Sequence, residues 1–168
     1  MQINARNQCD DIDRWRICSV WGSVPAPPPG TTWIGLMHKA LRLARKAFLK
    51  DEVPVGALIV DGTGVILATA HNETEATRDP TAHAEILALR RAAERVGNNR
   101  LEGCVLVVTL EPCMMCTGAL REAHIAGVVY GAADARAGAV CSCFEGLDYC
   151  QTGTSAWHYG GIESAECA

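Results

Sequence analysis

Hydrophobic side chains recur at three- and four-residue steps along residues 32–50, and this spacing predicts an amphipathic helix. The apolar positions that define the stripe are Ile34, Met37, Leu41, Ala44 and Phe48. The basic residues that lie off the stripe are Lys39, Arg42, Lys46 and Lys50. We interpret this basic side as a solvated helix face rather than as an anion-binding surface.

Two short apolar runs follow, at 55–60 and 65–69, and a glycine-rich turn at 61–64 joins them. Short runs of this kind around such a turn predict a β-hairpin. A polar segment over 71–79 then leads to a second predicted helix at 81–96. The apolar stripe of that helix consists of Ala82, Ile86, Leu89, Ala93 and Val96.

The run 104–109 is almost entirely apolar, which predicts a strand that is covered on both faces. Pro112 suits the start of a helix, because a proline in the first turn loses no intrahelical hydrogen bond. We therefore expect a helix over 112–125, a strand at 127–130 and a fifth strand at 156–159. Strands that alternate with helices after one hairpin predict an α/β fold, with a mixed sheet and helices on both faces.

Residues 1–30 differ from the rest of the chain. They show no sustained hydrophobic period and end in a proline-rich run at 25–30, which resists both helix and strand. We expect a flexible N-terminal leader over 1–30 and one domain over 31–168.

The composition narrows the class of protein. With 168 residues, 49% of them hydrophobic, the chain can bury a substantial core. The net charge of −4 argues against indiscriminate coating of nucleic acid but leaves room for a local basic patch. No run approaches the ~20 apolar residues needed to span a bilayer, and the N-terminus lacks a secretory pattern. We expect a cytoplasmic protein in which most of the nine cysteines are idle thiols.

Two short motifs carry the chemistry: His83-Ala84-Glu85 and Pro112-Cys113-Met114-Met115-Cys116, each at a predicted helix start. One imidazole nitrogen and two thiolates suit Zn²⁺, and three protein ligands leave a fourth position for water. Zinc would activate that water, and Glu85 would move its protons. His83, Cys113 and Cys116 are therefore the predicted metal ligands and Glu85 the predicted catalytic residue.

The two motifs together form the signature of zinc-dependent nucleobase deaminases. The chain resembles the bacterial tRNA adenosine deaminases, within the cytidine deaminase superfamily. The resemblance covers roughly residues 33–142. The stretches that carry it are Glu52–Ala57, His71-Asn72, Asp79–Glu85, Thr109–Cys116 and Gly131–Gly138.

The resemblance implies a three-layer α/β/α cytidine deaminase-like fold with a mixed five-stranded sheet, a homodimer, and one Zn²⁺ per subunit without an organic cofactor. It implies a hydrolase acting on carbon–nitrogen bonds in cyclic amidines. The reaction would convert adenosine to inosine at the wobble position of a tRNA anticodon stem-loop, with zinc-activated water attacking C6.

The resemblance also implies substrate contacts. Asn72 would hydrogen-bond the nucleoside, and the Ala84 N–H would contact the base. Val55 would pack on the base, and Leu110 and Glu111 would line the pocket mouth. Asp134 matches a position near the bound nucleic acid. From the residues alone, Asn72 is equally typical of a polar turn, and Val55 is typical of a strand core.

The chain departs from the family at its end. The family usually continues through an aromatic and basic C-terminal helix that grips RNA, whereas this chain stops at 161–168, so we expect a truncated helix. Gly153-Thr154 replaces an Asn-His pair, and Cys141-Ser142-Cys143 replaces small residues. Deamination of a free nucleobase or nucleoside (guanine, cytosine or adenosine) is therefore an alternative. A structural zinc module is another, with Cys141, Cys143 or His158 as fourth ligand.

Overall fold

The computed structural model describes residues 25–147 and 156–168. Its centre is one five-stranded sheet with the strand order β2-β1-β3-β4-β5. β1 is antiparallel to both β2 and β3, whereas β3, β4 and β5 are parallel, so the sheet is mixed as predicted. The strands are β1 (Gly56–Val60), β2 (Ile66–His71), β3 (Val105–Leu110), β4 (Gly127–Ala132) and β5 (Trp157–Tyr159).

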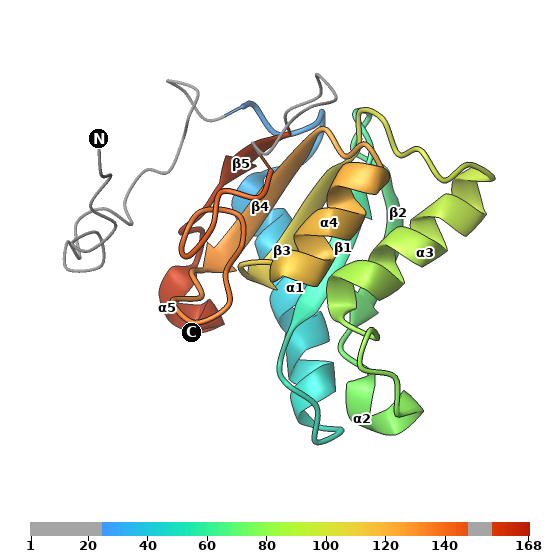
Figure 1. Ribbon diagram of the computed structural model, residues 1–168. Coiled ribbons are helices and arrows are strands. Elements are labelled where there is room, and N and C mark those ends of the chain that lie inside the picture. The colour runs from blue at the N-terminus through green and yellow to red at the C-terminus, as the bar shows by residue number, and fades with distance from the viewer. Residues whose placement is uncertain (1–24, 148–155) are drawn as a thin grey trace, which may run out of the picture.

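Helices cover both faces of this sheet. α3 and α4 lie on the face nearer the viewer in Figure 1, and α1 lies behind the sheet. The short α5 contacts β3 and β4. The helices are α1 (Trp33–Phe48), α2 (Thr74–Thr77), α3 (Ala84–Val96), α4 (Met114–Glu122) and α5 (Ser164–Cys167). This arrangement confirms the predicted α/β/α fold.

The alternation of side chains along the central strands builds two cores. In β1, Ala57 and Ile59 belong to the cluster under α3 and α4, whereas Leu58 and Val60 belong to the cluster under α1. All five residues of β1 are buried. The prediction of a strand covered on both faces is likewise confirmed for β3, where Val105–Thr109 are buried.

The predicted apolar stripe of α1 is wrong in its phase. Ile34 and Phe48 are 53% and 65% exposed, and the buried residues are Trp33, Leu36, Met37, Ala40, Ala44 and Ala47. The helix lies so close to the sheet that a Cβ on Gly56 would come within 2.1 Å of the Ala40 carbonyl oxygen. Small residues, Ala40 and Ala44, must therefore face the sheet at this crossing, and the resulting rotation of the helix leaves Ile34 and Phe48 exposed.

The stripe predicted for the second helix is also partly wrong. α3 begins at Ala84, three residues later than predicted, and Val96 is 48% exposed. The buried side of α3 consists of Ala84, Glu85, Ile86, Ala88, Leu89 and Ala92.

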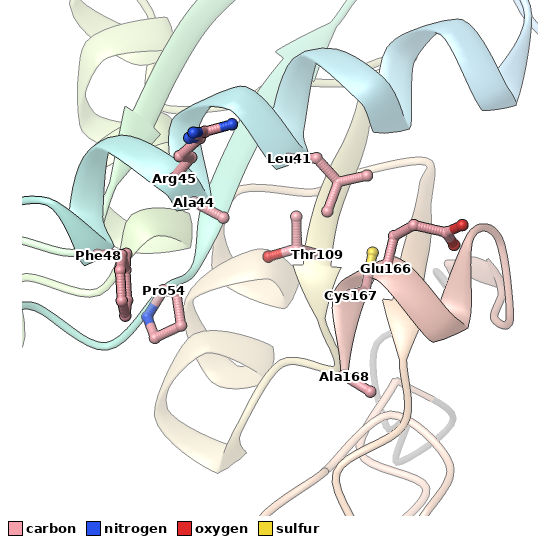
Figure 2. A pocket seen from close by; sticks show the side chains of 9 residues that line it. All are labelled: Leu41, Ala44, Arg45, Phe48, Pro54, Thr109, Glu166, Cys167 and Ala168. Carbon is pink, nitrogen blue, oxygen red and sulfur yellow. The ribbon is translucent and has the colours of Figure 1, made fainter.

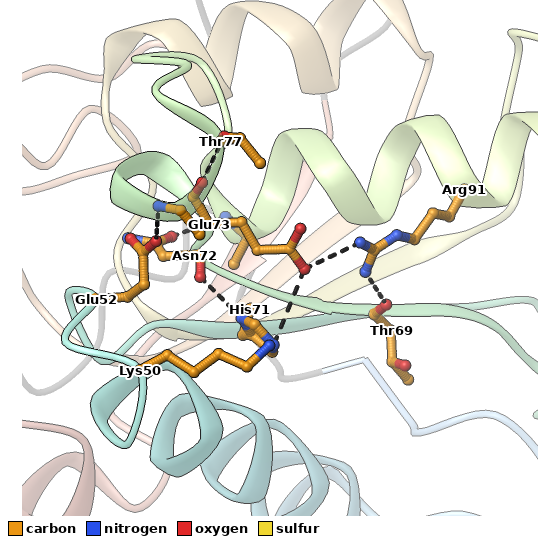
Figure 3. Close-up of polar contacts among 10 residues, drawn as sticks. Lys50, Glu52, Thr69, His71, Asn72, Glu73, Thr77 and Arg91 are labelled. Atoms are coloured by element: carbon orange, nitrogen blue, oxygen red, sulfur yellow. Dashed lines mark hydrogen bonds and ion pairs between the residues drawn. The ribbon is translucent and has the colours of Figure 1, made fainter.

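The outer edge of β2 is covered by side chains of α3. The Arg91 guanidinium donates a 2.9 Å hydrogen bond to the Thr69 carbonyl oxygen, a contact drawn in Figure 3. Arg95 Nη1 donates to the carbonyl oxygens of Ile66 and Leu67, each at 3.0 Å. β2 is the edge strand of the sheet formed by the described residues, and these bonds satisfy main-chain acceptors on its outer side.

A cavity of about 320 Å³ lies on the α1 face of the sheet, between α1 and the last residues of the chain. Figure 2 shows Leu41, Ala44 and Phe48 along one side and Glu166–Ala168 along the other. Thr109 also lines the cavity, and its hydroxyl accepts a 3.1 Å hydrogen bond from the Gly56 N–H.

Part of the predicted leader packs against the domain. Trp33 Nε1 donates to the Pro25 carbonyl oxygen at 2.9 Å, and the Thr31 hydroxyl donates to the Pro28 carbonyl oxygen at 2.7 Å. Residues 1–24 of that leader lie outside the described residues, so the boundary at residue 30 stays a prediction. Among the described helices, none is both long enough and apolar enough to cross a membrane.

Candidate metal centre and active site

The two motif helices begin at the same edge of the sheet. β2 and β3 flank β1 and both run antiparallel to it, so they end at the same edge of the sheet, at His71 and Leu110. The chain passes from β2 through α2 to α3, and from β3 directly to α4. The N-termini of α3 and α4 therefore converge at this edge.

Three predicted ligands meet at these helix starts. His83 is the N-cap residue of α3 and Cys113 the N-cap residue of α4, and Cys116 lies in the first turn of α4. Their donor atoms all lie within 4.8 Å of one another. His83 Nδ1 is 3.8 Å from Cys113 Sγ and 3.5 Å from Cys116 Sγ. The predicted helix at 112–125 is shorter, so Cys113 precedes the helix instead of lying within it.

The spacing of the three donor atoms fits zinc. Bond lengths of about 2.3 Å to sulfur and about 2.0 Å to nitrogen at tetrahedral angles place a sulfur and a nitrogen ligand roughly 3.6 Å apart. The two His83–cysteine distances lie on either side of that value. The donor set therefore suits a tetrahedral Zn²⁺ site with one position left over.

The local electrostatics favour thiolate ligands. A hydrogen bond from the Cys116 side chain lowers the pKa of the Cys113 thiol to about 5, against the opposing effect of burial. The same hydrogen bond raises the pKa of Cys116, because the pair shares a single negative charge. Partial positive charge at the N-terminus of α4 favours thiolates at this position. A divalent cation would replace the shared proton.

Glu85 is the second residue of α3 and lies beside the three candidate ligands. Its side chain is buried, and burial raises the pKa of its carboxyl group. The charges of His83 and Cys113 and a Cys116 side-chain hydrogen bond also act on the Glu85 carboxyl group, which places it next to the metal group. A buried carboxyl group of raised pKa is suited to accepting and returning a proton.

Asn72 is joined to the residue between His83 and Glu85. Its Oδ1 accepts a 2.8 Å hydrogen bond from the Ala84 N–H, and both residues are buried. The resemblance implied that the Ala84 N–H contacts the substrate base. In the structure, this N–H donates its hydrogen bond to Asn72. The Asn72 Nδ2 group donates no hydrogen bond to the described residues, so it is available to a substrate. The predicted substrate roles of Asn72 and Ala84 stay predictions.

A polar network behind Asn72 was not found from the sequence (Figure 3). His71 Nδ1 lies 2.8 Å from the Asn72 carbonyl oxygen. The buried Glu52 carboxylate accepts hydrogen bonds from Thr74 Oγ1 at 3.0 Å and from the Ala76 N–H at 2.9 Å, which ties α2 to the turn after α1. Glu52 gives no recognisable sequence pattern, because one of its partners is a main-chain group.

The turn that delivers His83 has a pattern that could have been recognised. Asp79 Oδ1 accepts hydrogen bonds from the Thr81 N–H at 2.8 Å and from the Thr81 hydroxyl at 2.7 Å. An aspartate that bonds the main chain two residues later is typical of such turns. The hydroxyl of Thr81 is the largest cause of the lowered pKa of Asp79.

Glu111 anchors the loop that follows β4, and its assignment to the pocket mouth stays a prediction. Its buried carboxylate accepts main-chain hydrogen bonds from the loop that follows β4 and from the Ser142 hydroxyl. The main-chain donors are the N–H groups of Asp134 (3.0 Å), Val140 (3.2 Å), Cys141 (2.8 Å) and Ser142 (2.8 Å). This loop also touches the metal group, because Gly138 forms a β-bridge with Cys113. Glu111 therefore holds a loop that lies against a metal ligand.

The remaining predicted contacts lie near the same edge of the sheet. Val55 is buried in the cluster under α3 and α4, and Leu110 is partly buried against that cluster. Asp134 is half-buried, and its carboxylate accepts hydrogen bonds from the Arg136 and Ala137 N–H groups at 2.9 and 3.2 Å. The assignment of Val55, Leu110 and Asp134 to substrate stays a prediction.

The proposed fourth ligands of a closed zinc site do not join this group. Cys141 is disulfide-bonded, which also departs from the expectation of idle thiols. Cys143 directs its Sγ to the Ala135 carbonyl oxygen at 3.2 Å, and His158 lies in β5. Within the described residues, the candidate metal group consists of His83, Cys113 and Cys116. Gly153-Thr154, which stands where the family has an Asn-His pair, lies outside the described residues.

Comparisons with known proteins agree with this geometry. Residues 32–132 match the family described as the cytidine and deoxycytidylate deaminase zinc-binding region. The chain is 48% identical over 127 residues to the tRNA-specific adenosine deaminase of Aquifex aeolicus, covering 75% of this chain and 83% of that protein.

Two solved structures extend the comparison. One comes from work on A-to-I editing by tRNA:A34 deaminases at the wobble position; it has a TM-score of 0.75 and 41% identity, covering 79% of this chain and 95% of that one. A guanine deaminase of Bacillus subtilis has a TM-score of 0.56 and 37% identity, covering 58% of this chain and 62% of that one.

Proposed function

The chain belongs to the family of tRNA-specific adenosine deaminases, and from that premise we propose that it hydrolyses adenosine to inosine at the wobble position of a tRNA anticodon. The reaction consumes water, breaks the bond between C6 and its amino group, forms a C6–O bond and releases ammonia. It therefore needs an activated water, a group that moves protons and a site that orients the base.

His83, Cys113 and Cys116 would hold one Zn²⁺ per subunit. When bound, zinc lowers the pKa of a water molecule toward neutrality and so supplies the nucleophile. The chain's own contribution is a half-buried group of three donors at two helix starts, which the sheet edge and the loop held by Glu111 keep in place.

Glu85 would take a proton from the attacking water and deliver protons to the ring nitrogen and to the departing amine. Its burial favours this role, because a carboxyl group of raised pKa returns protons more readily than an exposed one. Asn72 would orient the nucleoside through its Nδ2 group, while its Oδ1 stays bonded to the Ala84 N–H.

The observation that carries this proposal is the position of Glu85, a buried carboxyl group beside three ligands that leave a coordination position open. A purely structural zinc site has four protein ligands and needs no such neighbour. The arrangement supports catalysis rather than a structural role for the metal.

The test of the proposal is an assay of inosine formation with purified protein. An anticodon stem-loop with adenosine at the wobble position is compared with free adenosine, guanine and cytosine, and zinc content is measured in parallel. We expect inosine in the RNA only. We also expect Glu85→Gln to keep its zinc and to lose activity by at least 10²-fold, the scale of general acid–base catalysis. Activity in this variant, or loss of its metal, would contradict the role of Glu85.

Deamination of a free base is a second candidate, and the similarity to a guanine deaminase favours it. In the same assay, turnover of guanine without inosine in the RNA would support this candidate and exclude the first. A comparison of kcat/KM for the two substrates on one preparation of enzyme separates the two functions.

We further propose that the protein works in the cytoplasm as a homodimer. Membership of a family of tRNA-modifying enzymes supports the compartment. Exposed methionines at the start of α4, Met114 and Met115, supply apolar surface for a subunit contact. Sedimentation of the purified protein tests the dimer, and a single species of about 18 kDa would contradict it.

A further inference from the structure

The outer surface of α1 carries an unusual concentration of positive charge. Five of the chain's 15 lysine and arginine residues lie there, and all five are exposed: Lys39, Arg42, Arg45, Lys46 and Lys50. No aspartate or glutamate occurs between residues 25 and 50, although the chain as a whole carries a net charge of −4. We name these five residues the α1 basic face.

No salt bridge within the described part of the chain neutralises the α1 basic face, although Glu166 lines the same cavity as Arg45. The polar contact of Lys50 is to His71 Nε2, at 3.5 Å. Several of the five residues are three or four positions apart, so their charges repel one another along the helix. Arg42, for example, lies three positions from both Lys39 and Arg45 and four from Lys46. Such a face weakens the helix unless an external anion compensates it.

The face extends toward the edge of the sheet where the active site lies. α1 crosses the first residue of β1 between Ala40 and Ala44, where a Cβ on Gly56 would clash with both. Gly56 pairs with His71 at the end of β2, so the last turn of α1 reaches the same sheet edge as the two motif helices. Figure 3 shows Lys50 reaching His71, the residue that precedes Asn72.

The surroundings of the basic face are suited to a nucleic acid. Phe48 is 65% exposed at the end of α1, next to Arg45, and both line the cavity of Figure 2. Basic residues that alternate with an exposed aromatic ring are typical of surfaces that bind phosphates and stack on bases. The last helical turn and Lys50 therefore combine charge and aromatic surface near the sheet edge where the two motif helices begin, on the opposite face of the sheet.

We propose that the α1 basic face binds the phosphate backbone of the RNA that carries the target nucleoside. This inference rests on the proposed function, because it assigns a binding surface to the same substrate. It replaces the interpretation of Lys39, Arg42, Lys46 and Lys50 as a merely solvated face. The phosphate groups of the RNA backbone supply negative charge to residues that form no ion pair within the described part of the protein. Their binding also releases counterions from the RNA.

The experiment compares Arg42→Ala with Arg100→Ala in the full chain. Arg100 is the matched control, because it is exposed and lies before β3, at the opposite edge of the sheet. The Kd for an anticodon stem-loop is measured over a series of salt concentrations, and inosine formation is measured in the same samples. We expect Arg42→Ala to weaken binding and to lower the slope of log Kd against log salt by about 0.7–0.9, one phosphate contact.

Arg100→Ala should leave both the affinity and the slope unchanged. Arg42→Ala should raise KM for the RNA with kcat unchanged. Its melting temperature should stay equal to or above that of the wild type, because the substitution removes charge repulsion along the helix and introduces a strong helix former. An unchanged slope in Arg42→Ala, or an equal loss in both variants, would overturn the proposal. If the wild type binds RNA with the expected slopes and forms no inosine, the proposed function fails and the binding surface stands.

Discussion

The side-chain amide of Asn72 and the main-chain N–H of Ala84 are joined by a hydrogen bond of 2.8 Å, and Ala84 separates the ligand His83 from Glu85. The bond links the end of β2 to the first residue of α3. Asn72 thus fixes the position of the helix start that carries the proposed ligand His83 and the proposed proton-transfer residue Glu85. The second polar group of its side chain, Nδ2, donates no hydrogen bond to the described residues.

Replacing Asn72 therefore has two separable effects. Asn72→Ala leaves the buried Ala84 N–H without an acceptor, and we expect a loss of about 1–3 kcal/mol in the free energy of unfolding. Asn72→Asp keeps the acceptor and loses the Nδ2 donor, so it should retain more stability and still lose deamination. Denaturant unfolding and the inosine assay distinguish the two. Equal unfolding free energies for both variants would show that the bond to Ala84 contributes nothing.

The Glu111 carboxylate provides a second test, because it accepts four main-chain N–H groups of one loop. Glu111→Gln replaces one acceptor oxygen with a donor that faces other donors. We expect a destabilisation of about 1–3 kcal/mol and faster hydrogen exchange at the amides of Asp134, Cys141 and Ser142. Glu145→Gln, an exposed change in the same loop, is the control and should alter neither quantity. Unchanged exchange rates in Glu111→Gln would exclude the anchoring role.

Two glycine-to-alanine substitutions should change the free energy of unfolding in opposite directions. A Cβ on Gly138 would lie 2.4 Å from Glu111 Oε2, so Gly138→Ala should displace the carboxylate and cost about 1–3 kcal/mol. Gly118 lies within α4 and has no atom within 4 Å of an added Cβ, so Gly118→Ala should stabilise the protein by about 0.5–1 kcal/mol. Thermal unfolding measures both, and a shift of the same sign in the two variants would refute the close approach at Gly138.

Acid should weaken the turn that leads to His83. The Thr81 hydroxyl, the Thr81 N–H and Arg90 hold the pKa of Asp79 below its usual value. A carboxylate whose folded pKa is lowered stabilises the fold above its unfolded pKa of about 3.9, and this contribution disappears as the pH falls through the folded pKa. We expect the stability of the wild type to exceed that of Asp79→Asn near neutral pH and to converge with it as the pH falls through the lowered folded pKa of Asp79. Parallel stability curves over that range would contradict the prediction.

The grouping of His83, Cys113 and Cys116 and the position of Glu85 beside them were predictable, because the spacing and residue types are constrained by coordination chemistry and by helix geometry. The order of helices and strands was predictable for a similar reason, since each hydrophobic period belongs to one kind of element. The phase of α1 was not: Ile34 and Phe48 are as hydrophobic as the residues that are buried. The close approach of Ala40 to Gly56 decides which side faces the sheet, and this depends on a tertiary contact.

The anchoring roles of Glu52 and Glu111 could not be predicted from residue types. Glu52 bonds the main chain of Ala76, and Glu111 bonds main-chain groups about thirty residues further along. Main-chain N–H groups occur at almost every position, so the residue types do not reveal which of them bond to a given carboxylate. The same holds for the bond between Ala84 and Asn72, of which only the side-chain half is visible in the sequence.

The two arginines of α3 that bond the outer carbonyl groups of β2 have a consequence for the behaviour of the protein in concentrated solution. An edge strand with free carbonyl groups offers a template to which another chain can add a strand. Here Arg91 and Arg95 occupy three of those carbonyl groups with charged side chains. The sheet therefore ends at β2, and growth of the sheet from one molecule to the next is blocked on that side by the helix that also carries Glu85.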